Sequence, residues 1–157
     1  MDELMRWLGE QMDKDERTAR AACWDEQSDV WIARPPQGAY EQYTVVDYLD
    51  DGVVAVTPEN ADDDGVGQHV AEWDPRRVLR EIDAKRGVLD LYATAVEDRV
   101  ALRARMREVL HADPDEFGRL HQQEFELMRV VGQLTPVVRL LVLPYADRPG
   151  CREEWKP

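Results

Sequence analysis

The sequence predicts an α+β fold dominated by helices, and three observations indicate it. Apolar residues recur every three or four positions over residues 2–22 and again beyond residue 67, which is the period of amphipathic helices. Between these regions, Val- and Tyr-rich runs alternate with Pro, Gly and Asp clusters, which is typical of short strands and turns. The length of 157 residues favours a single domain, with 1–66 as an acidic helix-and-sheet part and 67–157 as a helical part with a C-terminal tail.

The first part is expected to contain one helix and a small antiparallel sheet. The helix covers residues 2–22 and opens with two acidic residues, which the helix dipole favours at that end. Two or three strands are expected from the β-rich runs 30–32, 43–49 and 53–57. The Asp-Gly pair at 51–52 predicts a tight hairpin turn between the last two runs, because both residues accept a positive φ.

The second part is expected to consist of helices, of which the last two are long and antiparallel. A short helix over 67–73 precedes Asp74-Pro75, a pair typical of the N-cap and first position of a helix. The first long helix then runs towards Leu110.

The next helix is expected to start at Asp113-Pro114, which repeats the same N-cap signal. It is expected to end near Gly132, and Pro136 is expected to begin a separate apolar segment over 137–143.

Composition narrows the possible partners and the compartment. The net charge is −13, and residues 1–66 hold 5 Lys/Arg against 17 Asp/Glu, which argues against direct binding to nucleic acid. Cys23 and Cys151 are the two cysteines and form no CxxC pair, so a disulfide scaffold is not expected. No apolar run approaches the about 18 residues of a membrane span, and the start has no basic segment typical of a secretory signal. We therefore expect a cytoplasmic protein that does not bind membranes.

No stretch carries a complete metal or nucleotide motif, and no cofactor is expected. Asn60, Asp62, Asp64 and Gly65 match the first half of a calcium-binding loop, but position 12 of that loop is Ala71 rather than a glutamate. A solvated acidic loop is the preferred interpretation.

Candidate catalytic residues are equally sparse. His121 and Glu124 can share a helix face but lack further ligands at a recognised metal spacing. Ser28 is the only serine and lies outside any GxSxG motif. Asp13 and Glu16 have a helical spacing that resembles the magnesium-binding acids of all-α nucleotide pyrophosphatases, so a metal-dependent nucleotide hydrolase stays an alternative.

Two segments carry a resemblance to a family. Residues 69–89 contain the string HVAEWDPRRVL, and residues 140–150 (LLVLPYADRPG) are followed by Glu153-Glu154-Trp155. With the acidic opening helix, they resemble a family of small uncharacterised proteins from actinobacteria and their phages. The first string is also loosely similar to the Ea22-like accessory proteins of tailed phages. The resemblance implies no activity, so no functional residue follows from it.

The preferred hypothesis is a non-enzymatic protein-interaction or regulatory module, an accessory protein of a phage or mobile element. Exposed aromatic residues mark such interfaces, and Trp73, Tyr145 and Trp155 are the candidate partner-binding residues. An acidic mimic of DNA that inhibits a nucleic-acid-binding protein is the alternative, because residues 1–66 hold most of the negative charge. The two long helices could also pair between chains, which predicts a possible homo-oligomer.

Overall fold

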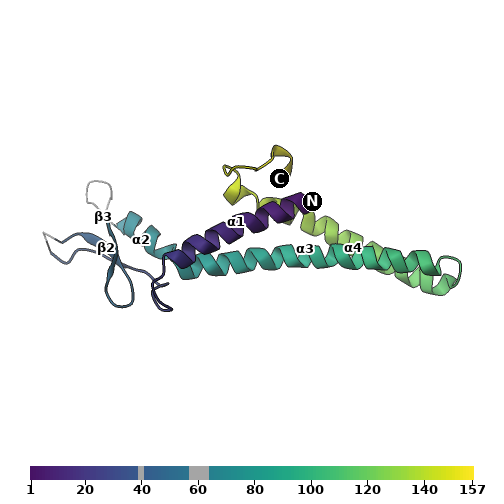
Figure 1. Ribbon diagram of the computed structural model, residues 1–157, viewed down its shortest axis with the longest axis horizontal. Helices are drawn as coiled ribbons and strands as arrows, with labels where there is room; N and C mark the ends of the chain where they lie inside the picture. The colour runs from purple at the N-terminus through teal and green to yellow at the C-terminus, as the bar shows by residue number, and fades with distance from the viewer. Residues whose placement is uncertain (39–40, 57–63) are drawn as a thin grey trace. The chain divides into compact units, whose positions relative to one another are not determined.

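The computed structural model describes residues 1–38, 41–56 and 64–157. It confirms the helix-dominated α+β class, with an N-terminal helix, a three-stranded sheet and long C-terminal helices (Figure 1). The elements in chain order are α1 (Asp2–Ala21), β1 (Ile32–Arg34), β2 (Tyr43–Val46), β3 (Gly52–Val56), α2 (Asp64–Glu72), α3 (Pro75–Val109), α4 (Pro114–Leu140) and the short 3₁₀ helices η1 (Leu143–Tyr145) and η2 (Glu153–Trp155).

The chain divides into two compact units. The hairpin unit consists of residues 1–11 and 84–157, and the sheet unit consists of residues 12–83. Helices α1 and α3 each contribute residues to both units. The single domain over 1–157 that the chain length suggests stays a prediction.

The sheet unit contains the three strands in the order β1-β2-β3, with both pairs antiparallel. Tyr43 pairs with Val56 across β2 and β3, and these two buried residues form a small apolar cluster with Ala33. Gly67 of α2 lies so close to Tyr43 that a Cβ at this position would overlap the tyrosine ring. Glycine therefore allows α2 to pack directly on the sheet.

The turn between β2 and β3 differs from the tight Asp-Gly turn that the sequence predicts. Residues 47–51 form the connection, Asp50 has the positive φ of 65°, and Gly52 already belongs to β3. The Asp47 Oδ1 atom accepts hydrogen bonds from the backbone N–H of Leu49 at 3.0 Å and of Asp51 at 2.8 Å. An aspartate side chain that closes the loop in this way replaces the two-residue turn.

The starts of the two long helices agree with the sequence. Asp74 caps α3 as expected, because its Oδ1 atom accepts a hydrogen bond from the N–H of Arg77 at 2.7 Å. Asp113 caps α4 in the same way, with the N–H of Glu116 as donor at 2.8 Å. Helix α2 starts at Asp64, three residues before the expected position.

The expected end of the last helix near Gly132 is wrong, because α4 continues through Pro136 to Leu140. A proline inside a helix removes one N–H donor and crowds the preceding turn. Here Thr135 Oγ1 donates to the carbonyl of Val131 at 2.7 Å, and Val138 and Val142 beyond the proline are fully buried. Tertiary packing of these valines outweighs the local cost of the proline.

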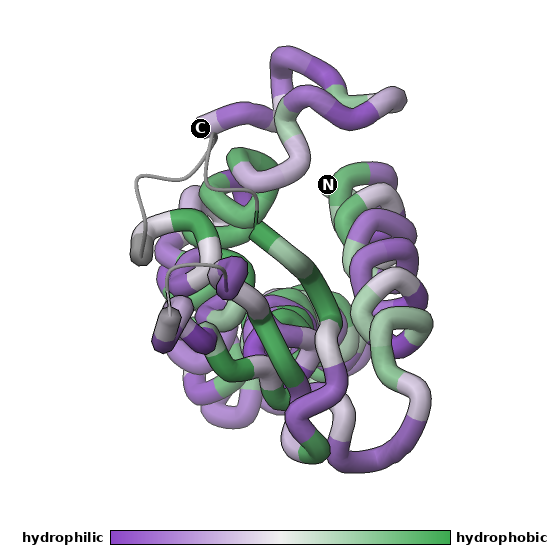
Figure 2. Tube along the Cα trace, turned by 90° about the vertical axis from the view of Figure 1, so that its left-hand side faces the viewer, coloured by the Kyte–Doolittle hydropathy of each residue, from purple (hydrophilic) through white to green (hydrophobic). Residues whose placement is uncertain are grey.

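In the hairpin unit, the C-terminal segment packs on the start of α1 (Figure 1). Trp7 is buried there, donates its indole N–H to the carbonyl of Pro149 at 3.3 Å, and lies 5.4 Å from Trp155 between ring centroids. Apolar and polar bands follow each other along α1 in Figure 2, and the buried residues Leu4, Leu8 and Met12 are four positions apart, as on one face of an amphipathic helix. The contact with Trp7 shows that Trp155 anchors the C-terminal tail.

Candidate interaction site

Helices α3 and α4 run antiparallel within the hairpin unit and meet along a seam of regular spacing. On α4 the seam residues follow each other at alternating steps of three and four, which is the heptad period of coiled coils. They are Phe117, Leu120, Glu124, Leu127, Val131, Leu134 and Val138.

Glu124 is the charged member of this series and is buried. Its Oε1 atom accepts hydrogen bonds from Arg99 Nε at 2.7 Å and from Arg103 Nε at 2.8 Å, both on α3. These bonds hold the pKa of Glu124 below its usual value, and the bond from Arg99 contributes most. Desolvation of the carboxylate acts in the opposite direction and raises the pKa. The three side chains form a polar layer that fixes the register of α3 against α4.

The two sides of this hairpin expose apolar residues. One side forms a groove of about 610 Å³, whose lining includes Ala101 and Leu102 from α3 and Leu127 and Val130 from α4. We call this side the groove face. Asp98, Arg105, Gln123 and Glu126 complete its lining.

The opposite side carries Val100, Phe125 and Met128, which we call the Phe125 face; all three are exposed. The groove contains Asp98 and Gln123, which immediately precede Arg99 and Glu124 of the polar layer. Val100 and Phe125 immediately follow that layer. Each residue advances a helix by about 100°, so these positions point to the other side of the hairpin.

Helix α4 with the η1 segment is the apolar part of the chain that bears on the expectation about membranes. Within the described part of the chain, Pro114–Tyr145 contains an 18-residue window with few charges that is long and apolar enough, by length and composition, to cross a membrane. This window is defined by its mean hydropathy and admits charged residues, so it does not test the expected location, which stays a prediction. Only 11% of that window is buried inside the structure, so this helix contributes much of the exposed apolar surface.

Of the candidate partner-binding residues, Tyr145 and Trp155 both lie against Trp7, at 6.4 and 5.4 Å between ring centroids, and Trp73 belongs to the other unit. Trp73 belongs to the sheet unit and is 44% exposed, with the Arg77 guanidinium 4.4 Å from its ring. Tyr145 belongs to the hairpin unit and is buried, with Lys85 and Arg148 over its ring at 5.5 and 4.8 Å. Tyr145 therefore presents little surface in this structure, and its assignment as a contact residue stays a prediction.

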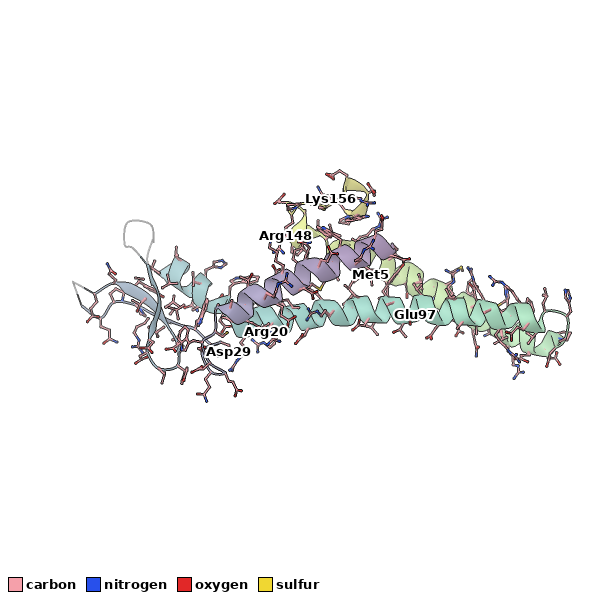
Figure 3. The ribbon with its side chains drawn as sticks, viewed as in Figure 1. Met5, Arg20, Asp29, Glu97, Arg148 and Lys156 are labelled. Atoms are coloured by element: carbon pink, nitrogen blue, oxygen red, sulfur yellow. The ribbon has the colours of Figure 1, made fainter. Side chains whose placement is uncertain are left out.

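Trp155 is half-buried on Trp7, and its ring also receives the Arg152 guanidinium at 4.8 Å. Arg148, labelled in Figure 3, donates to the backbone carbonyl of Gln11 in α1. These contacts of Trp155 and Arg148 with α1 give Tyr145 and Trp155 a structural role within the hairpin unit. Trp73 is therefore the most exposed residue of the expected set.

Ser28 has a structural role in a turn of the sheet unit. Its buried Oγ atom accepts hydrogen bonds from the N–H groups of Trp24 at 2.9 Å and Asp25 at 3.0 Å, and donates to the carbonyl of Asp25. The carboxylate of Asp25 in turn accepts a hydrogen bond from the hydroxyl of Tyr48 at 2.6 Å. This bond is the main cause of the lowered pKa of Asp25.

The acidic residues considered as metal ligands or as part of a DNA mimic lie in several different elements of the structure. Among the described residues, no group of three His, Cys, Asp or Glu side chains could hold a metal ion. Glu16 pairs with Arg20 at 2.7 Å, and Glu124 pairs with arginines while His121 stacks on Phe117. Asn60 and Asp62 of the calcium-like loop lie outside the described residues, and Asp64 begins α2.

Sequence reasoning missed the groove face and the Phe125 face. The heptad spacing over 117–138 was a signal for the first, because a seam at that period leaves its flanking positions half-covered. No motif signals the second, since Phe125 and Met128 read equally well as core residues of an amphipathic helix.

Comparison with known proteins places the chain in a family. No curated protein and no solved structure matches it. One family model, described as "Family of unknown function (DUF6221)", matches residues 1–157. Because this match spans the whole chain, the chain belongs to that family of unknown function.

Proposed function

We propose that this protein is a non-enzymatic protein-interaction module that binds a protein partner through the Phe125 face. The observation that carries the proposal is the exposure of large apolar side chains on a regular helix pair: Phe125 is 59% exposed, and Val100 and Met128 lie uncovered beside the polar layer. Large apolar side chains that gather on one side of a helix pair without a covering element favour an interaction site.

The partner is a protein rather than a lipid bilayer. Helix α4 is paired with α3, which carries ten charged residues between positions 84 and 109, and the Glu124 layer ties the two helices together. Insertion of α4 into a bilayer would require either that the charged helix α3 is inserted with it or that the two helices separate. Both carry a high cost in free energy. This supports a protein contact. A cytoplasmic location belongs to the same proposal. The net charge of −13 supports the absence of direct binding to nucleic acid.

Two finer statements belong to the same proposal. The resemblance of residues 69–89 and 140–155 supports an accessory role in a phage or mobile element of actinobacteria. Trp73, half-exposed beside a guanidinium, supports a second contact point, since Trp and Arg are enriched at binding hot spots.

The DNA-mimic alternative receives less support. A mimic needs free carboxylates in a spaced stripe, whereas Asp29 binds Arg76 through two hydrogen bonds of 2.8 and 2.9 Å. Asp25, Asp47 and Asp74 accept backbone N–H groups in turns and caps. These acids hold the sheet unit together instead of facing a partner.

Affinity capture from a host lysate at low and high salt tests the proposal. We expect a partner that stays bound at high salt, because apolar contacts are not screened. Phe125→Glu should abolish capture, whereas Leu49→Glu, on a side chain with a similar exposure of 58%, should not. Equal capture by both variants would exclude the Phe125 face, and nucleotide turnover by the pure protein with magnesium would contradict the non-enzymatic role.

A further inference from the structure

The groove face carries charges in a pattern that is complementary to itself. On α3, Asp98 and Arg105 are seven residues apart, which is two helical turns, so they lie on the same face. On α4, Arg119 and Glu126 have the same separation and the opposite order of charges. Asp98, Arg105 and Glu126 line the groove, and Arg119 is exposed two turns from Glu126.

The two pairs are centred at the same level of the hairpin. The midpoint of the α3 pair falls between Ala101 and Leu102, and the midpoint of the α4 pair falls between residues 122 and 123. Glu124 bonds both Arg99 and Arg103, so position 124 lies beside positions 99–103 of α3. The midpoints therefore lie side by side, within about one helical residue, which is about 1.5 Å along the axis.

A two-fold axis that crosses both helices at this level would place each of these four charges opposite its complement. Asp98 would face Arg105 of a second copy, and Arg119 would face Glu126 of a second copy, in both directions. Interfaces between identical subunits with two-fold symmetry have this reciprocal character, in which residue i meets j and j meets i. Ala101 and Leu102 would meet their own counterparts at the centre.

The charge balance of the hairpin permits such contact. Residues 84–140 hold nine Lys/Arg and nine Asp/Glu, whereas residues 1–83 hold 8 against 21. The negative charge that would repel a second copy thus lies outside this segment of the sequence. Burial of the apolar lining then has no net Coulomb repulsion from the hairpins to overcome.

We infer that the groove face binds a second copy of this chain, with α3 against α3 and α4 against α4, each pair antiparallel. The inference rests on the proposed function, because it assigns one side of the same hairpin surface to self-association and leaves the Phe125 face to the partner. The protein is then a dimer that presents two Phe125 faces.

Sedimentation of the full-length protein over a range of concentrations tests the inference. The wild type should show a reversible monomer–dimer equilibrium. Val130→Glu, which puts a carboxylate on the groove face, should yield monomer, whereas Val100→Glu, the same change on the Phe125 face, should leave the dimer intact. Circular dichroism should show unchanged helix content in each variant.

Charge reversal tests the symmetry itself. Arg119→Glu brings like charges together twice per dimer and should raise the dimer Kd by on the order of tenfold or more. Adding Glu126→Arg to the same chain restores both pairs with exchanged signs, so the Kd should return towards the wild-type value. We choose this pair because Arg105 also bonds Glu108 and Glu116 within the chain, each at 3.0 Å.

Several outcomes would overturn the inference. A wild type that is monomeric at every concentration excludes self-association, and a dimer that tolerates Val130→Glu uses another surface. A double variant no tighter than the single one excludes the reciprocal pairing. Binding of anionic lipid vesicles that Val130→Glu abolishes, without dimer formation, would assign the groove to lipid. Loss of capture by Phe125→Glu is measured independently, so failure of this inference leaves the proposed function standing.

Discussion

At the scale of single residues, Gly67 shows how one missing Cβ positions an element. The glycine sits in α2 against the ring of Tyr43, the residue that joins β2 to the apolar cluster of the sheet unit. Nothing in the sequence around Gly67 signals this contact, because the tyrosine is 24 positions earlier in the chain. The close approach follows from packing α2 on the sheet.

Gly67→Ala should lower the free energy of unfolding by about 1–3 kcal/mol, because the added methyl group would displace an aromatic ring that is already buried. Gly65→Ala, in the same helix with nothing within 4 Å of the added Cβ, is the matched control. It should be neutral or slightly stabilising, since alanine favours helix. Urea denaturation compares the two variants, and equal effects would mean that α2 does not rest on Tyr43.

The side chain of Glu124 makes the stability of the folded protein depend on pH. Its folded pKa is lower than its unfolded pKa, so its contribution to stability is present above the unfolded value and is lost as the pH falls through the folded value. In Glu124→Gln, this loss between mildly acidic and strongly acidic pH should disappear, and the variant should be less stable than the wild type near neutral pH.

Thermal unfolding as a function of pH measures this effect. Glu97, labelled in Figure 3, is an exposed glutamate on α3, and Glu97→Gln serves as the control. The acid-dependent decrease in melting temperature should stay the same in this control. If Glu124→Gln retains the full acid dependence of the wild type, the polar layer does not stabilise the hairpin.

At the scale of elements, α4 is the helix whose local sequence and tertiary role disagree. Pro136 costs a helix interior about 3 kcal/mol relative to alanine, yet the helix continues for four residues beyond it. The residues that follow supply fully buried valines, Val138 and Val142. Their burial requires the chain to continue on the path of the helix.

Pro136→Ala should therefore raise the free energy of unfolding, by about 1–3 kcal/mol, because it restores an N–H donor and removes the crowding of the preceding turn. Pro144→Ala is the control, since Pro144 lies at the start of η1, where proline is tolerated. Chemical denaturation followed by circular dichroism measures both. A destabilised Pro136→Ala would show that the core depends on a bend that the proline imposes.

At the scale of the whole molecule, the distribution of charge and apolar surface separates the roles of the two units. The sheet unit, residues 12–83, holds 7 Lys/Arg against 18 Asp/Glu, whereas the hairpin unit, residues 1–11 and 84–157, is close to balanced with 13 against 15. The balanced part is also the part with exposed apolar helix surface. This combination suits association through the hairpin, with the acidic part providing solubility.

A stable dimer makes the melting temperature depend on protein concentration, because association stabilises the folded state by mass action. We expect the melting temperature of the wild type to rise with concentration and that of Val130→Glu to stay constant. Differential scanning calorimetry over a wide concentration range measures this. A wild-type melting temperature that does not change would contradict dimerisation through the groove face.

The sequence by itself determined the class of fold, the starts of the long helices and a small antiparallel sheet of two or three strands, although β1 covers 32–34 rather than the expected 30–32. These features follow from local chemistry: Asp74 and Asp113 cap helices, and β-branched runs favour strands. The resemblance of residues 69–89 and 140–155 pointed to a family of small uncharacterised proteins, and the family match confirms that coarser statement.

Only the tertiary structure decided where α4 ends, which aromatic residues are exposed and which charges meet. Pro136 and Gly132 signal a break locally, but buried contacts made by residues further along override it. Tyr145 looks like a surface aromatic in a polar tail, and it is buried because the chain folds back onto Trp7. Exposure and pairing depend on residues that are distant in the sequence, and a local pattern carries no information about them.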